Sequence, residues 1–172
     1  MDILKTMQHQ PISNWDIESL PYFINEDECK EIIRLGQHDL TFSEVGTAGK
    51  REINDFRKSQ TGTLCVCDKA IRNLRDKIAD KLNVNIDQIE GLQYQFYTKG
   101  GYFKEHADYF DAHNMKKFGL ASGNRIKTLM IYLNQDMEGG TTNFNAVDRA
   151  YMPLQGWGLT WDNLNDKGKP QI

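Results

Sequence analysis

The stretch GLQYQFYTKGGYFKEHADYF, residues 91–110, decides how the rest of the chain is interpreted. In its first half, Leu92, Tyr94 and Phe96 alternate with residues of the opposite parity, which is the period of a β-strand. A Gly-Gly pair interrupts this pattern, and a second strand is predicted over Tyr102–Asp108. The sequence therefore indicates β-structure from this point onward.

The segment downstream of residue 110 continues with short apolar runs separated by turn residues. Gly139-Gly140 and the stretch from Pro153 to Gly156 provide the clearest breaks. The predicted strands are Ile126–Asn134, Thr141–Phe144, Ala150–Met152 and Gly158–Asp162.

Two amphipathic helices are predicted upstream. Asn25–Gln37 begins with a capping box of Asn25 and Glu28, and Asp68–Leu82 begins with an aspartate cap. Both repeat apolar residues with a helical period. The intervening stretch Thr41–Thr63 is polar and carries three glycines, which predicts a long loop or loosely paired strands.

Helices first and many short strands afterwards predict an α+β fold that is mainly β, a sandwich or barrel buttressed by the N-terminal helices. The chain has 172 residues, within the range of one domain, and shows neither an internal repeat nor a linker. We therefore expect a single domain over residues 1–172.

The composition narrows the class of protein. Hydrophobic residues make up 39% and charged residues 26%, and no apolar run reaches the roughly 20 residues of a membrane span. A formal charge of -3 without a basic run argues against nucleic acid as a main partner. Met1–Trp15 lacks the pattern of a signal peptide, so we expect a cytoplasmic protein without a membrane role.

Three cysteines, Cys29, Cys65 and Cys67, fit that expectation as reduced thiols with packing roles. The C-x-C pair, if it lies on a strand, is too close in sequence for an easy bridge. No disulfide is therefore predicted.

His106-Ala107-Asp108 is the first candidate for chemistry. On a strand, side chains two residues apart project to the same face, so this imidazole and carboxylate could share one ion. A mixed nitrogen and oxygen pair suits a borderline divalent metal and, with a second histidine, makes the facial triad of non-haem Fe(II) oxygenases. Alone, H-x-D is also common as a surface histidine beside a solvated aspartate.

Further motifs lie before and after His106-Ala107-Asp108 in the sequence. Tyr97-x-x-Gly100-Gly101 precedes it, R-x-x-T-x-x-x-Y-L-N follows at 125–134, and G-G-x-T-x-F follows at 139–144. In this order the motifs resemble the 2-oxoglutarate and Fe(II)-dependent prolyl 4-hydroxylase family, from about residue 25 to the end. The resemblance implies a double-stranded β-helix, a cupin-like jelly roll with helices on one sheet.

The resemblance also implies roles for individual residues. His106 and Asp108 would be metal ligands and catalytic, and Arg125 would lie near the bound substrate at the barrel mouth. The 2-oxoglutarate pocket would be lined by Tyr97, Thr128 and Tyr132.

The residues themselves leave alternatives open. Thr128 and Tyr132 share a parity, so both hydroxyls can face the barrel interior. Tyr97 and Tyr132 could equally be core tyrosines with satisfied hydroxyls, and Arg125 a solvated strand-end arginine. Arg57-Lys58-Ser59 matches weakly a loop that covers the site in the family.

The chain departs from the family pattern at its end. Family members carry a second iron-binding histidine on a late strand and, beyond it, a lysine that binds 2-oxoglutarate. No histidine follows His113, and a triad that used His113 would draw on one short segment without the rigidity of opposed strands. We therefore expect that the sequence given lacks the C-terminal strand or strands of the domain.

The resemblance implies a dioxygenase that hydroxylates a prolyl residue in a peptide or protein. It would use Fe(II) and 2-oxoglutarate, with ascorbate as reductant. Two alternatives stay open: a related oxygenase acting on a free amino acid or other small substrate, and a catalytically silent jelly-roll binding module. The sequence does not indicate an oligomeric state.

Overall fold

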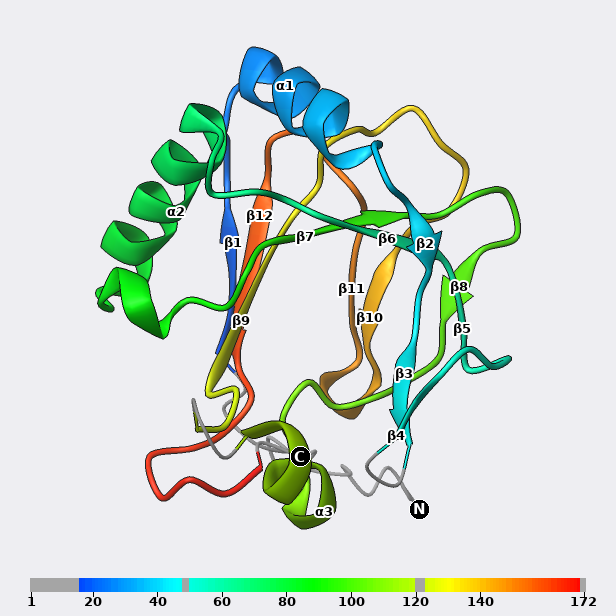
Figure 1. Cartoon of the computed structure of the whole chain (residues 1–172), viewed down its shortest axis with the longest axis vertical. Helices are drawn as coiled ribbons and strands as arrows, with labels where there is room; N and C mark the ends of the chain where they lie inside the picture. Colours follow the sequence, from blue (N-terminus) through cyan, green and yellow to red (C-terminus); the bar gives the residue numbers. More distant parts are fainter. Residues whose placement is uncertain (1–15, 48–49, 120–122, 171–172) are drawn as a thin grey trace, which may run out of the picture.

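A computed structural model describes residues 16–47, 50–119 and 123–170, and it contains both helices and many short strands (Figure 1). No helix within these ranges is long and apolar enough to cross a membrane. The helices are α1 Glu26–Gly36, α2 Lys69–Leu82 and α3 Ala112–Asn114, with a π-helical turn at Met115–Gly119 and 3₁₀ turns at Ile86–Gln88 and Asn145–Val147. The strands are β1 Ile17–Leu20, β2 Thr41–Phe42, β3 Val45–Thr47, β4 Lys50–Glu52, β5 Arg57–Lys58, β6 Gln60–Thr63, β7 Gln93–Phe96, β8 Tyr102–Phe103, β9 Lys127–Ile131, β10 Thr142–Phe144, β11 Arg149–Tyr151 and β12 Gly158–Asp162.

The antiparallel sheet β1-β12-β9 is the centre of the molecule (Figure 1). Its register pairs Trp161 with Thr128 and Leu159 with Met130, so these four side chains share one face. That face packs with Phe144 of β10 into one hydrophobic cluster. The opposite face belongs to a second cluster, formed with the helices.

Helices α1 and α2 cover that second face (Figure 1). Asn25 caps α1 through the predicted capping box, because its side chain accepts from Glu28 N–H and its own N–H donates to Glu28. Asp68 precedes α2 without a side-chain cap bond, and Asn83 ends the helix in the left-handed conformation. The helices contribute the following buried residues: Cys29, Ile32, Ile71, Leu74 and Ile78.

Smaller sheets complete the architecture. β2-β6-β7 forms a second three-stranded sheet, and the pairs β10-β11, β3-β4 and β5-β8 are two-stranded. The described residues of the segment Thr41–Thr63 therefore form short, loosely paired strands, the second of the two predicted arrangements. β1, whose Ile17 and Leu20 are buried, was not expected from the sequence.

The predicted strand Tyr102–Asp108 is shorter in the structure. β8 ends at Phe103, and it pairs with the two-residue strand β5. The backbone then leaves the sheet after Lys104 N–H donates to the carbonyl of Phe56. His106 and Asp108 thus lie on a loop, so the shared direction argued from strand parity needs another cause.

The expectation of three reduced thiols is wrong for two of them. Cys65 and Cys67 form a disulfide, with Cα atoms 5.2 Å apart. The pair lies on a turn, closed by the Asp68 N–H that donates to Cys65 O, and this turn brings Cys65 and Cys67 within bridging distance. Cys29 is a free, fully buried thiol, and burial raises its pKa.

Candidate active site

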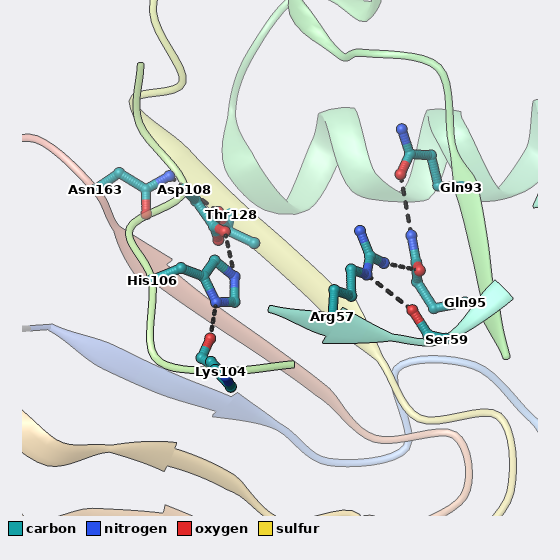
Figure 2. A network of polar contacts seen from close by, with 9 residues as sticks. All are labelled: Arg57, Ser59, Gln93, Gln95, Lys104, His106, Asp108, Thr128 and Asn163. Carbon is teal, nitrogen blue, oxygen red and sulfur yellow. Dashed lines mark hydrogen bonds and ion pairs between the residues drawn. The ribbon is translucent and has the colours of Figure 1, made fainter. Parts of the chain in front are cut away.

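His106 and Asp108 are in contact. His106 Nε2 lies 3.3 Å from Asp108 Oδ1, and both side chains are partly exposed. The other ring nitrogen, Nδ1, lies 2.7 Å from the backbone carbonyl of Lys104 (Figure 2). In a neutral ring, donation from Nδ1 to this carbonyl leaves the lone pair of Nε2 directed toward Asp108.

Asp108 is held by the central sheet. Thr128 Oγ1 of β9 donates to Asp108 Oδ2 at 2.7 Å, and Asn163 Nδ2 donates to Thr128 Oγ1 at 2.9 Å (Figure 2). Asn163 is itself buried. Burial alone would raise the pKa of Asp108, but it is outweighed by hydrogen bonds from His106, when Nε2 carries a proton, and from Thr128, and by the charges of protonated His106 and of Arg125. This pKa is therefore lowered.

The imidazole of His106 is held from one side by an aromatic ring. Phe103, the last residue of β8, stacks on it with ring centroids 3.5 Å apart. The guanidinium of Arg57 lies 4.5 Å from the Phe103 centroid. Strand β5 therefore supports the histidine indirectly through Phe103.

The His106–Asp108 pair fits a divalent cation. Two neighbouring ligands on an octahedral ion with bonds of roughly 2.1 Å lie about 3 Å apart, which is close to the separation of Nε2 and Oδ1. Lone pairs of a neutral imidazole and a carboxylate repel each other at this distance unless a proton or a metal neutralises them. Within the described residues, no group of three or more His, Cys, Asp and Glu side chains is placed to hold a metal.

A second polar network lies beside this pair. Arg57 donates through Nε to Ser59 Oγ at 2.8 Å and through its terminal nitrogen to Gln95 Oε1 (Figure 2). Gln95 Oε1 also accepts from Thr61 Oγ1. Burial lowers the pKa of Arg57, an effect that nearby Tyr97 and Asp108 partly offset, so this guanidinium belongs to the same electrostatic environment as both predicted site residues.

Arg125 forms a bidentate ion pair with Glu90. Its Nε and one terminal nitrogen donate to both carboxylate oxygens of Glu90, at 2.7 and 2.9 Å, and its guanidinium lies over the ring of Phe110. Hydrogen bonding to Glu90 raises the pKa of Arg125. The arginine is therefore fixed in orientation, close enough to Asp108 for their charges to interact.

Tyr132 lies farther along the central sheet. It is the fourth residue after Thr128, about 13 Å away along an extended chain. Its hydroxyl donates to Thr142 Oγ1 at 2.7 Å, and burial raises its pKa. It borders a cavity of about 170 Å³ that also involves Tyr151, Trp157 and Leu159, and none of the lining residues is His106, Asp108, Tyr97 or Thr128.

The structure thus brings His106, Asp108 and Thr128 together, places Arg125 near Asp108 and Tyr97 near Arg57, and sets Tyr132 apart. Sequence reasoning did not single out several polar residues of these networks, among them Thr61, Glu90, Gln95, Thr142 and Asn163. The parity of Gln95 with Tyr97 and the position of Thr142 in the G-G-x-T-x-F motif were available signals. Nothing in the sequence connects Glu90 with Arg125 or Asn163 with Thr128, because each pair joins segments more than 30 residues apart.

Comparison with known sequences gives a consistent group of relatives. Residues 92–168 match the family described as the 2OG-Fe(II) oxygenase superfamily. The chain is 31% identical over 164 residues to the probable prolyl 4-hydroxylase 10 of Arabidopsis thaliana, covering 92% of this chain and 54% of that protein. It is 34% identical over 153 residues to prolyl 4-hydroxylase subunit alpha-2 of Caenorhabditis elegans, covering 87% of this chain and 28% of that protein. The chain thus spans about half the length of the Arabidopsis relative.

Solved structures agree on the fold. The viral collagen prolyl hydroxylase from Paramecium Bursaria Chlorella virus-1, solved with 2OG, superimposes with a TM-score of 0.66 at 21% identity, covering 90% of this chain and 81% of that one. A Pseudomonas putida prolyl-4-hydroxylase gives a TM-score of 0.55 at 15% identity, covering 87% and 80%. The chain is therefore similar in sequence and in fold to the prolyl 4-hydroxylases of the 2OG-Fe(II) oxygenase superfamily.

Proposed function

We propose that the protein is an Fe(II)- and 2-oxoglutarate-dependent dioxygenase that hydroxylates prolyl residues in a peptide or protein. The observation that carries this proposal is the His106–Asp108 pair, two metal-type donors 3.3 Å apart inside the segment that matches the oxygenase superfamily. The names of the relatives and of both solved neighbours support proline as the substrate residue. When bound, Fe(II) with 2-oxoglutarate supplies the oxidising chemistry that an unactivated C–H bond requires.

In this proposal His106 Nε2 and Asp108 Oδ1 hold the metal, in a double-stranded β-helix buttressed by α1 and α2. The Lys104 carbonyl fixes the imidazole tautomer, and Thr128 fixes the carboxylate rotamer. Such partners raise metal affinity because the ligands are oriented before the ion binds.

Three hydroxyl residues would serve 2-oxoglutarate. Thr128 lies beside Asp108, Tyr132 follows the end of β9 and borders a separate cavity, and Tyr97 lies close to Arg57. To donate to carboxylate oxygens of the cosubstrate, Thr128 and Tyr132 would have to give up their present hydrogen bonds to Asp108 and Thr142. Ascorbate is proposed as the reductant that keeps iron ferrous.

Arg125 would orient the substrate peptide. The Glu90 pair and the Phe110 ring already restrict its rotamers, so little further side-chain entropy is lost when a peptide carbonyl binds. Substrate orientation of this kind lowers the barrier without any covalent contribution from the side chain.

The test is 2-oxoglutarate turnover by the protein expressed from its complete coding sequence, with Fe(II), ascorbate and proline-containing peptides. Succinate should form in step with a hydroxylated peptide, and His106→Ala or Asp108→Ala should reduce both to background. His113→Ala is the matched control, because His113 is exposed and seven residues from His106. Peptide-independent turnover with a free amino acid would favour the small-substrate oxygenase. If the protein shows neither turnover nor Fe(II) binding, the result would support the alternative of a catalytically silent binding module.

A further inference from the structure

The bridge between Cys65 and Cys67 lies apart from the candidate active site, on the loop that leads from β6 into α2. Both cysteines are exposed, and Val66 between them is 53% exposed. The third cysteine, Cys29, is fully buried. The chain therefore exposes two cysteine residues to solvent and buries the third.

The surroundings of this loop resist unfolding. Leu64 is buried and donates its N–H to Leu92 O, and Asp68 N–H closes the turn on Cys65 O. Arg72 NH1 donates to the carbonyls of Val66 and Cys67, at 2.8 and 2.6 Å. These contacts do not involve sulfur, so the turn can keep its shape whether the bridge is closed or open.

We propose that Cys65 and Cys67 form a reversible redox site that exchanges with small thiols such as glutathione. An exposed bridge that closes a loop of only three residues restricts the unfolded chain little and leaves both sulfur atoms open to attack. This inference is independent of the oxygenase activity.

The two sulfur atoms have different neighbours. Cys65 Sγ lies 3.2 Å from the N–H of Cys67, which would stabilise a thiolate on Cys65. Cys67 Sγ lies 3.8 Å from a carboxylate oxygen of Asp68, which disfavours a thiolate on Cys67. Cys65 is therefore the better leaving group, and the incoming thiolate attacks Cys67.

The reaction balances with glutathione as reductant. A glutathione thiolate bonds to Cys67 Sγ while the Cys65–Cys67 bond breaks and Cys65 leaves as a thiolate. A second glutathione thiolate then attacks the glutathione sulfur of the mixed disulfide and releases Cys67. The protein bridge gains two electrons and two protons, and two glutathione molecules become one glutathione disulfide.

The experiment equilibrates the native protein in buffers of varied glutathione to glutathione disulfide ratio, quenches it with acid and locates maleimide labels by mass spectrometry. Cys65 and Cys67 should gain label together as the buffer becomes more reducing, and Cys29 should stay unlabelled in the native protein. Full labelling of the pair in the most oxidising buffer, or none in excess dithiothreitol, would overturn the proposal.

Single-cysteine variants test the direction of attack. At neutral pH, Cys65 in Cys67→Ser should be alkylated about fivefold faster than Cys67 in Cys65→Ser, because more of it is thiolate. Adding Asp68→Asn to Cys65→Ser should narrow the gap, and asparagine is also a good residue at a helix N-terminus. Equal rates in the two single variants would overturn the assignment of Cys65 as the leaving thiolate.

Discussion

The two faces of strand β9 differ in the kind of contacts that their side chains make. On one face, Leu129 and Ile131 join the hydrophobic cluster under α1 and α2. On the other, Met130 packs with Trp161 while Thr128 donates to Asp108. Under the helices, β9 contributes apolar side chains, whereas the opposite face also needs hydrogen bonds of defined geometry.

This difference indicates which face of β9 contributes mainly to stability and which contributes to the candidate site. Apolar packing on the helix side is non-directional and holds the sheet in place. The other face places one carboxylate through a chain of two hydrogen bonds, from Asn163 to Thr128 to Asp108. We therefore expect changes under the helices to act mainly on stability, and changes on the other face to act on metal binding at a smaller cost in stability.

The largest effect is expected for Ile71→Ala, on the helix side. Ile71 is fully buried in α2, so losing three carbons leaves a cavity and should lower the free energy of unfolding by about 3 kcal/mol. Urea denaturation at unchanged m-value measures it. Val66→Ala, at an exposed position, is the control and should change this free energy by less than about 0.5 kcal/mol. A loss for Ile71→Ala as small as that for Val66→Ala would contradict the statement that the helix side carries the stability.

A second large effect is expected at Gly156, where the helix layer joins the sheet. Its N–H donates to Tyr132 O and its carbonyl accepts from Ile24 N–H. The residue has φ +78°, and a Cβ there would lie 2.2 Å from the Ile24 carbonyl oxygen. Gly156→Ala should therefore lower the free energy of unfolding by roughly 2–3 kcal/mol.

Gly91→Ala is the matched control for that substitution. A Cβ at Gly91 meets nothing within 4 Å, and its φ is not in the left-handed region. The expected change is within about 1 kcal/mol and in the stabilising direction, because alanine restricts the unfolded chain. Similar losses from both glycines would show that the close approach at Ile24 does not matter.

On the opposite face of β9, Thr128→Val should have a smaller effect on stability. Valine keeps the shape but leaves Asp108 and the buried Asn163 without their shared partner, at a cost of about 1–2 kcal/mol. The same change should weaken divalent metal binding, measured by anaerobic calorimetry, because the carboxylate loses its fixed rotamer. Thr128→Ser keeps the hydroxyl and should retain the affinity. Unchanged metal affinity in Thr128→Val would show that Thr128 does not contribute to metal binding.

The helices and the alternation of β9 could be predicted because their signals are local. A period of 3.6 with the capping box of Asn25 gives α1, and a period of two sends Thr128 and Leu129 to opposite faces. Which strands become neighbours in the sheets has no such local signal. β1 was missed for this reason, since its place beside β12 depends on partners more than 130 residues away.

The residues of the candidate site could be identified from the sequence, but the contacts that position them could not. H-x-D identified His106 and Asp108, but the argument from strand parity was wrong, because β8 ends at Phe103. What aligns the two side chains is tertiary: the stack on Phe103 for the histidine and the Thr128 hydroxyl for the aspartate. The disulfide was missed because the turn at residues 65–68 replaces the strand assumed for the C-x-C pair.

The smallest expected effect is a pH dependence of stability that belongs to Asp108. Its native pKa lies below its ordinary value of 3.8, since hydrogen bonds from His106 and Thr128 outweigh the effect of burial. Between the native and the unfolded pKa the unfolded chain binds more protons, so the free energy of unfolding rises with pH in that interval. The stabilisation from Asp108 is thus fully present above the unfolded pKa and is lost as the pH falls through the native one.

Asp108→Asn isolates this contribution, because an amide does not titrate and other lowered carboxyl pKa values, such as that of Glu28, are common to both proteins. Urea denaturation from pH 5 down to about pH 3 should show the wild type losing more stability than the variant, so the two curves converge on acidification. Glu26→Gln is a matched comparison on the helix side. The Glu26 carboxylate pairs with exposed Lys30 and solvent screens that pair, so the substitution should barely change the slope of stability against pH. Parallel curves for wild type and Asp108→Asn would mean that the hydrogen bonds to Asp108 are no stronger in the native protein than those water makes in the unfolded chain. The face of β9 that holds Thr128 would then place the carboxylate without stabilising its charge.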